Sequence, residues 1–236
     1  MKGEVLKSLI ARRAERRAVA LATLLDGGGQ WLIGAHEAPG DAPPAVVEAA
    51  RAALADDDSR TVDTAAGRVF VQVHSPPWRM LIVGAVHIAQ PLARISALAG
   101  YDVTVIDPRG AFATAERFPD IAVSDDWPDD ALARLAPDAR TAVVTLTHDP
   151  KLDDPALTVA LRSAAFYVGA LGSARTHAKR IERLKEAGLD DAAISRIHGP
   201  IGLAIGARSP AEIAVAILAQ VIETRRRGRP KARQAA

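Results

Sequence analysis

The sequence predicts an α/β fold in which a doubly wound parallel sheet follows a smaller α+β domain. From residue 80 onward, short apolar blocks alternate with helical patterns. The blocks are almost free of polar residues, which is typical of parallel strands buried on both faces. Just before them, Pro76 and Pro77 interrupt any regular pairing, because proline has no N–H to donate. We therefore expect a domain boundary at this point.

The composition excludes several classes of protein. The 236 residues are 49% hydrophobic and 25% charged, which suits one large or two small soluble domains. The absence of cysteine excludes disulfides, thiolate metal sites and a catalytic thiol. A net charge of +2 and only 4% aromatic residues argue against a nucleic-acid surface. Because there is no apolar run of about 20 residues, we expect no membrane segment and a cytoplasmic location.

The first domain, residues 1–77, is expected to combine helices with a small sheet. Its expected elements are a helix near the N-terminus, strands at 18–25 and 31–34, a helix at 46–54 and a strand at 68–74. In the last strand valine recurs at every second position, so Val69, Val71 and Val73 should share one buried face.

The second domain, residues 78–225, is expected to contain the parallel sheet. Strands are predicted at 80–83, 103–106, 121–123, 142–146 and 166–169, and helices at 88–98, 129–135, 153–163, 174–187 and 210–225. Right-handed crossovers between such strands give the order 3-2-1-4-5. Ser209 and Glu212 form the pattern of a capping box at the start of the last helix. The basic tail, residues 226–236, is interpreted as a solvated terminus.

The clearest sign of a ligand site is the turn after the first of these strands. Gly84 lies between an apolar strand and a helix, and Asp107 ends the next strand. A glycine turn and an acid at this kind of spacing bind the pyrophosphate and the ribose of a dinucleotide. The second glycine of that pattern is replaced by Val86, whose side chain should block the pyrophosphate. We therefore predict a Rossmann-like architecture in which NAD(P) binds only weakly.

A second group of polar residues follows the fourth strand and comprises His148, Asp149 and Lys151. In the predicted order, strands 1 and 4 flank the topological switch point, and ligands bind outside the carboxyl ends of such strands. This group should therefore face the turn after strand 1. Two interpretations stay open: phosphate, metal or proton chemistry centred on His148, and capping of the next helix by Asp149 or Asp153.

A third group surrounds the end of the fifth strand and the start of the following helix. Its members are Gly169, Gly172, Ser173, Arg175 and His177. A helix N-terminus beside an arginine can bind an anion, whereas the serine alone can serve as an ordinary N-cap. Further on, His198 opens a long glycine-rich loop, a type of loop that is often functional.

Residues 79–224 resemble the XdhC/CoxI family of accessory proteins for xanthine dehydrogenase and related molybdenum hydroxylases. The matching segments are LIVGAVHIA at 81–89, VTVIDPR at 103–109, FATAERFP at 112–119, THDPK at 147–151, GALGSARTH at 169–177 and HGPIG at 198–202. The resemblance implies a Rossmann-like C-terminal domain, binding of molybdenum cofactor (molybdopterin) while it is matured, and transfer of the cofactor to an apoenzyme. It also implies a homodimer.

The chain departs from the family pattern in two places. The family carries a glycine where this chain has Val86, and its N-terminal domain carries cysteines in a region that corresponds to residues 34–50. Any step that relatives perform through those thiols cannot occur on this chain.

Together with the resemblance, the three groups define a set of candidate cofactor-binding residues. The set is Gly84, His87, Asp107, Arg109, His148, Asp149, Lys151, Gly169, Gly172, Ser173, Arg175, His177 and His198. In this interpretation the helix N-termini and the arginines hold the anionic cofactor, and the histidines donate hydrogen bonds to its oxo or phosphate oxygens.

The leading hypothesis is a cytoplasmic maturation factor that carries molybdenum cofactor without turnover of its own. Its partner would be a molybdenum hydroxylase of the xanthine dehydrogenase or CO dehydrogenase type. Two alternatives stay open. One is an NAD(P)-dependent oxidoreductase, which Gly84 and Asp107 favour and Val86 opposes. The other is a regulatory or scaffold protein that has lost its ligand.

Overall fold

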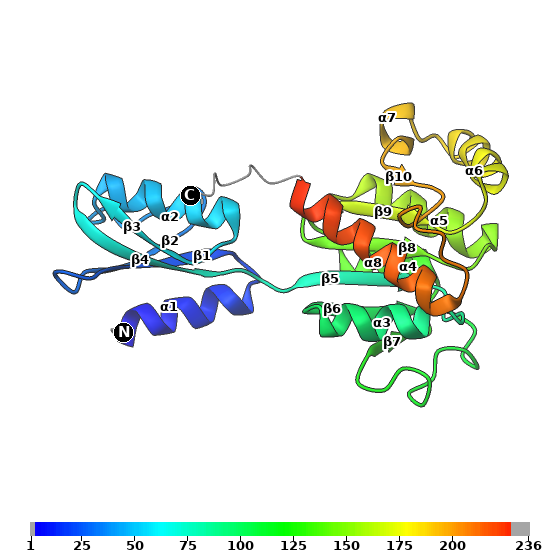
Figure 1. Cartoon of the computed structure of the whole chain (residues 1–236), viewed down its shortest axis with the longest axis horizontal. Coiled ribbons are helices and arrows are strands. Elements are labelled where there is room, and N and C mark those ends of the chain that lie inside the picture. Colours follow the sequence, from blue (N-terminus) through cyan, green and yellow to red (C-terminus); the bar gives the residue numbers. More distant parts are fainter. Residues whose placement is uncertain (1–2, 228–236) are drawn as a thin grey trace. The chain divides into compact units, whose positions relative to one another are not determined.

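The computed structural model describes residues 3–227, which form two compact units divided between Pro76 and Pro77 (Figure 1). The N-terminal unit consists of α1 (Gly3–Ala14), β1 (Val19–Leu24), β2 (Gln30–Ile33), α2 (Pro44–Asp56), β3 (Arg60–Thr64) and β4 (Gly67–His74). Its sheet has the order β2-β1-β4-β3, and all neighbouring strands are antiparallel.

The two faces of this small sheet are covered by different helices. Val19 and Leu21 of β1 pack with Leu9 of α1, whereas Ala20 and Ala22 of the same strand pack with α2 on the opposite face. Successive side chains of a strand point to opposite faces, so a single strand contributes to both small cores.

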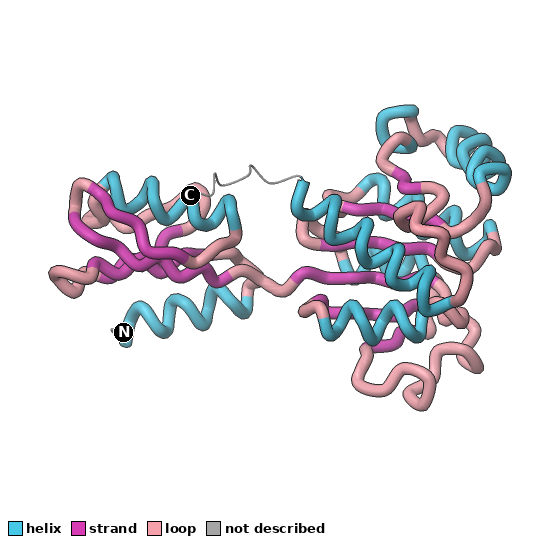
Figure 2. The backbone as a smooth tube through the Cα atoms, in the orientation of Figure 1, coloured by secondary structure: helices cyan, strands magenta, loops and turns pink. Residues whose placement is uncertain are grey.

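The C-terminal unit contains a six-stranded sheet with helices on both sides. Its strands are β5 (Trp78–Val83), β6 (Tyr101–Ile106), β7 (Ala122–Ser124), β8 (Thr141–Thr145), β9 (Tyr167–Ala170) and β10 (Ile197–His198). Its helices are α3 (Ala89–Leu98), α4 (Pro128–Leu135), α5 (Pro150–Arg162), α6 (Ala174–Glu186), α7 (Asp191–Ile194) and α8 (Pro210–Arg227). Figure 2 shows this alternation of strands and helices along the chain.

The strand order is β10-β9-β8-β5-β6-β7, and every neighbouring pair is parallel. This is the predicted order 3-2-1-4-5 with one further short strand beside the fifth. The predicted doubly wound α/β fold is therefore confirmed. Between β5 and β8 the direction of winding changes, so the carboxyl ends of these two strands mark the switch point.

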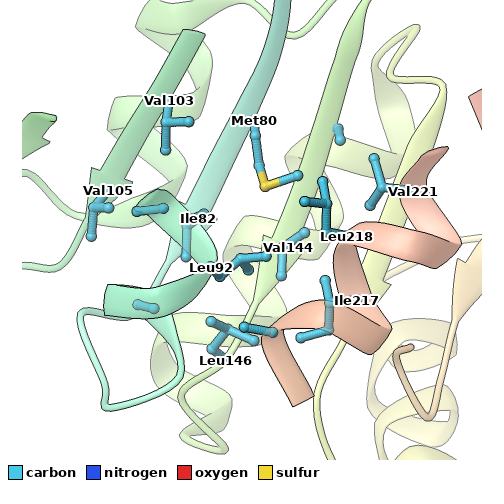
Figure 3. Close-up of a cluster of buried hydrophobic side chains, with 14 of the residues drawn as sticks. Met80, Ile82, Leu92, Val103, Val105, Val144, Leu146, Ile217, Leu218 and Val221 are labelled. Atoms are coloured by element: carbon cyan, nitrogen blue, oxygen red, sulfur yellow. The ribbon is translucent and has the colours of Figure 1, made fainter. Parts of the chain in front are cut away.

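The central strands of this sheet are buried on both faces, as their apolar sequence indicates. Met80 and Ile82 pack on one face with α3 and α8, for example against Leu92 and Ile217 (Figure 3). Leu81 of the same strand packs on the other face, with α4 and α5. Because helices cover both faces of these strands, side chains that point to either face must be apolar, which explains the nearly unbroken apolar sequence.

Three elements were not expected from the sequence: β3, α7 and β10. Strand β3 is only partly buried and largely polar, and β10 and α7 are two and four residues long. The capping box of the last helix is confirmed, since Glu212 accepts from the Ser209 amide at 2.9 Å and Ser209 accepts from the Glu212 amide at 3.3 Å. Most of the predicted basic tail, residues 228–236, lies outside the described residues. Within residues 3–227, no helix has the length and apolar character needed to cross a membrane.

Candidate functional site

The turn after β5 and the segment after β8 are in direct contact. Gly84 has φ = +103°, and a Cβ at this position would lie 2.4 Å from Cγ2 of Thr147. Only glycine fits there, because it tolerates this φ and leaves room for the threonine methyl group. The structure thus places the turn after β5 against the start of the segment after β8, as the switch-point geometry requires.

Asp107 is closed off by hydrogen bonds at this turn. One carboxylate oxygen accepts from the Ala85 amide and from Nη2 of Arg109, both at 2.8 Å. The other accepts from the amide and Nε of Arg109, at 3.0 and 2.9 Å. The side chain is fully buried, which alone would raise its pKa, but the hydrogen bonds from Arg109 and Ala85 outweigh burial and hold the pKa below its ordinary value. In this structure the Asp107 carboxylate is thus held by Arg109 and the Ala85 amide, and its ribose-binding role stays a prediction.

The other residues singled out near this turn are paired with a neighbour, packed on the core or exposed to solvent. Arg109 is neutralised by Asp107, and its guanidinium lies over the Phe112 ring at 4.7 Å. The half-buried Val86 packs against the hydrophobic core. His87 is exposed at the surface of the turn. In the turn after β5, the Gly84 amide donates to the Ile106 carbonyl and the Ala85 amide to Asp107.

The segment after β8 forms a capped helix start. The side chain of Asp149 accepts from the Lys151 amide at 3.0 Å, so Asp149 is the N-cap of α5 and its candidate role in cofactor binding is not supported. Thr147 Oγ1 donates to Asp153 Oδ1 at 2.7 Å, so Asp153 does not cap the helix. His148 is exposed and has φ = +65°. The side chain of Lys151 is also exposed, and only its amide takes part in the cap.

The turn after β9 is likewise built around a cap. Ser173 accepts from the Thr176 amide at 3.2 Å, which confirms it as the N-cap of α6. Gly172, in the same turn, has φ = +139°. Gly169 is a packing position in β9, because a Cβ there would meet Ile201 and Tyr167 within 3 Å. Packing alone therefore accounts for glycine at position 169.

Two of the candidate histidines are packed into the protein. His198 stacks on the Tyr167 ring at 4.5 Å, and burial lowers its pKa. His177 is half-buried against Gly199, and burial lowers its pKa as well. Burial thus favours the neutral form of both side chains, and within the described chain His177 Nδ1 is buried without a hydrogen-bond partner.

A pocket of about 170 Å³ opens between the segment after β8 and helix α6. We call it the α5–α6 pocket, and its charged and polar lining includes His148, Asp153, Arg175, Lys179, Arg180 and Arg183. Two of these residues, His148 and Arg175, were predicted as cofactor ligands from the sequence. The other three basic residues were missed, although basic side chains at 175, 179 and 183 recur every four residues and must share one helix face.

The α5–α6 pocket is lined by a buried aspartate–arginine pair, Asp153 and Arg180, some of whose polar atoms have no hydrogen-bond partner. The side chains of Asp153 and Arg180 are each 2% exposed, and Arg180 Nη2 lies 3.7 Å from Asp153 Oδ2. Arg180 Nη2 donates to the Leu171 carbonyl at 2.8 Å. Within the described chain, Arg180 Nε, Arg180 Nη1 and Asp153 Oδ2 are buried and have no hydrogen-bond partner. Buried polar groups are rarely left in this state, so these atoms are candidates for contact with a ligand.

The electrostatics of the pocket favour an anion. Burial raises the pKa of Asp153 despite Thr147 and Arg180, and burial lowers the pKa of Arg180 despite Asp153. Arg183 is paired with Asp154, whose Oδ1 lies 3.1 Å from its Nη2. Arg175 and Lys179 are exposed and have no acidic partner among residues 3–227. The N-terminus of α6 adds partial positive charge beside them.

These observations define a class of protein: a doubly wound, parallel-sheet domain with a pocket rich in basic side chains outside the carboxyl end of its sheet. A family model described as the XdhC Rossmann domain matches residues 80–221. The chain therefore belongs to the XdhC family.

Relatives with more specific names match about two thirds of the chain. It is 33% identical over 150 residues to the molybdenum cofactor insertion chaperone PaoD of Escherichia coli, covering 64% of this chain and 41% of PaoD. It is 32% identical over 160 residues to a Bacillus subtilis protein described as a probable xanthine dehydrogenase subunit, covering 67% of this chain and 46% of that protein. The chain thus spans less than half the length of these relatives.

A solved structure supports the fold of both units. It is described as a xanthine dehydrogenase from Bacillus halodurans and superposes with a TM-score of 0.70 at 24% identity. The match covers 98% of this chain and 66% of that chain.

Proposed function

We propose that this chain binds molybdenum cofactor and delivers it to a molybdenum hydroxylase of the xanthine dehydrogenase or CO dehydrogenase type. Membership of the XdhC family and the names of two relatives support this function. The observation that carries the proposal is the positive α5–α6 pocket beside the segment after β8, whose buried Arg180 has two nitrogen atoms without a hydrogen-bond partner. A cofactor that is anionic through its phosphate and dithiolene groups matches this donor set.

The residues present fit an anionic pterin better than a metal ion held directly by the protein. The chain has no cysteine, and the described residues include no cluster of three or more histidine, aspartate or glutamate side chains. Arg175, Lys179 and Arg180 would therefore hold the anionic atoms of the ligand, while His148 borders the pocket entrance. The cofactor supplies redox chemistry to the hydroxylase that receives it, and this chain holds and releases it without turnover.

The remaining features of the proposed role come from the family resemblance. We propose that the chain acts in the cytoplasm as a homodimer and docks its apoenzyme directly. With direct docking, the cofactor passes from this chain to the apoenzyme without being released into solvent.

The experiment that tests this function is cofactor analysis of the purified chain. After expression in cells that make molybdenum cofactor, oxidation should release a fluorescent pterin, and the loaded chain should activate an apo-hydroxylase in a purified mixture. Calorimetry with NAD and NADP should show only weak binding, because Asp107 already occupies the Ala85 amide and is itself occupied by Arg109. Absence of pterin together with micromolar NAD(P) affinity would favour the oxidoreductase. Absence of both ligands would favour the scaffold.

A further inference from the structure

The guanidinium of Arg180 is held in place by the protein, but only some of its N–H groups have a hydrogen-bond partner. Its guanidinium is held from one side by the Leu171 carbonyl and faces Asp153 at 3.7 Å. Nε and Nη1 remain buried without a partner. A guanidinium has five N–H donors in a rigid fork, which matches the oxygens of a carboxylate or phosphate group. Nε and Nη1 lie on different edges of the guanidinium, so an anion in the pocket can accept from either of these unmet donors.

The charges around the α5–α6 pocket favour a ligand group with two negative charges over a group with one. Asp153 offsets one positive charge and Asp154 pairs with Arg183, which leaves Arg175 and Lys179 unbalanced at the rim. Two excess positive charges match a phosphate monoester, which carries nearly two negative charges at pH 7. A carboxylate would neutralise only one of them.

The size of the pocket limits how much of a ligand it can enclose. Its volume is about 170 Å³, below the roughly 300–1,000 Å³ of pockets that enclose a whole drug-sized molecule. A phosphate group fits this space, whereas a pterin or a dinucleotide must extend outside it.

We propose that the α5–α6 pocket binds the terminal phosphate of a larger phosphorylated ligand, with Arg180 as the buried anchor and Arg175 and Lys179 as the outer charges. The proposal rests on the proposed function in taking molybdenum cofactor as that larger ligand. In this arrangement the phosphate enters between the segment after β8 and α6, and accepts from an unmet N–H group of Arg180. The rest of the ligand lies toward the exposed side of the pocket, where His148 is.

Two small probes test the site without the cofactor. Calorimetry at about 0.15 M salt, where exposed charges are screened, compares inorganic phosphate with glycerol phosphate. Both should bind the unaltered chain. Binding of inorganic phosphate alone would overturn the proposal, because the end of a larger ligand must tolerate a carbon substituent on one oxygen. Absence of binding by both probes would also overturn it.

Three variants locate the binding. Arg175→Gln/Lys179→Gln removes only exposed charges and should weaken both probes by about tenfold. Asp153→Leu/Arg180→Met replaces the buried pair together, so no lone charge stays buried, and should abolish binding while the fold is retained. Lys185→Gln, which removes one positive charge at the far end of α6, is the control and should bind as the unaltered chain does. Equal binding by the control and the buried-pair variant would contradict the assignment.

The outcomes separate this site from the proposed function. If both phosphates bind but the purified chain carries no pterin, the phosphate site stands and the identity of the larger ligand is wrong. If the chain carries pterin that the buried-pair variant retains in full, the function stands and the pocket assignment is wrong.

Discussion

Two Asp–Arg pairs lie near the carboxyl end of the same parallel sheet. They differ in how many of their polar atoms have a hydrogen-bond partner. Asp107 and Arg109, after β6, are joined by three hydrogen bonds, and the arginine remains partly exposed. Asp153 and Arg180, below the α5–α6 pocket, are both buried, stand 3.7 Å apart and retain three atoms without a partner. The first pair closes a turn that resembles a nucleotide site. The second leaves donors available for a ligand.

The two pairs show that residues at motif spacing and residues with unmet hydrogen bonds can be different residues at the same end of the sheet. Asp107 stands at the spacing of a ribose-binding acid, but its carboxylate is consumed locally. Among the buried atoms without a partner in residues 3–227 are Nε and Nη1 of Arg180, a residue that no motif marks. A ligand site is better located by hydrogen bonds that the fold leaves unmade than by those that a sequence pattern suggests.

The largest effect is expected from breaking the buried pair on one side only. Arg180→Met leaves Asp153 buried without a counterion and should destabilise the C-terminal unit by about 3–5 kcal/mol in urea unfolding at pH 7. Asp153→Leu/Arg180→Met should recover most of this loss. A single variant as stable as the double variant would show that Asp153 is not charged in the folded protein.

The loss of unfolding free energy in Arg180→Met should also depend on pH, in a direction that the pKa of Asp153 determines. Without Arg180, the pKa of Asp153 in the folded protein rises further above the unfolded value of about 3.9. A raised acid pKa makes folding less favourable as the pH rises through that range. The stability deficit of Arg180→Met should therefore be greatest near pH 7 and shrink as the pH falls toward about 4. A deficit that is constant with pH would indicate lost packing instead.

A smaller effect is expected from the satisfied pair. Asp107→Asn should cost about 2 kcal/mol at pH 7, since it removes charged hydrogen bonds from Arg109 and the Ala85 amide. The folded pKa of Asp107 is depressed, so its contribution is present above the unfolded value of about 3.9 and is lost as the pH falls below it. Asp102→Asn, which removes an exposed acid of the preceding strand β6, is the control and should change stability little at any pH.

The smallest effect on stability is expected at the pocket entrance. His148→Asn should change the free energy of unfolding by no more than about 0.5 kcal/mol, because the residue is exposed and asparagine tolerates its φ of +65°. Loading with pterin should nevertheless fall. A large drop in melting temperature with unchanged loading would assign His148 a structural role instead.

The sequence predicts the sheet well because the central strands are apolar on both faces and the chirality of crossovers leaves few orders. It predicts the helix caps at Asp149 and Ser173 because capping depends on local residues. It misses β10 because two residues beside an existing strand carry no periodic signal.

The site is predicted less completely, for a physical reason. Whether Asp107 or Arg180 has free hydrogen-bonding atoms depends on partners that are distant in sequence or set by side-chain geometry. Arg180 of α6 faces Asp153 of α5, and its carbonyl partner belongs to the turn after β9. The basic face of α6 is visible in the sequence, but the buried pair beneath it is not.

The most direct test of the difference between the two pairs is the amount of pterin carried per chain by three purified proteins. The unaltered chain and Asp107→Asn should carry similar amounts, since the Asp107 carboxylate is already held by Arg109 and the Ala85 amide. Asp153→Leu/Arg180→Met, confirmed as folded by circular dichroism, should carry little or none. Equal loading of all three proteins, or loss of pterin in Asp107→Asn alone, would contradict the assignment of the cofactor to the α5–α6 pocket.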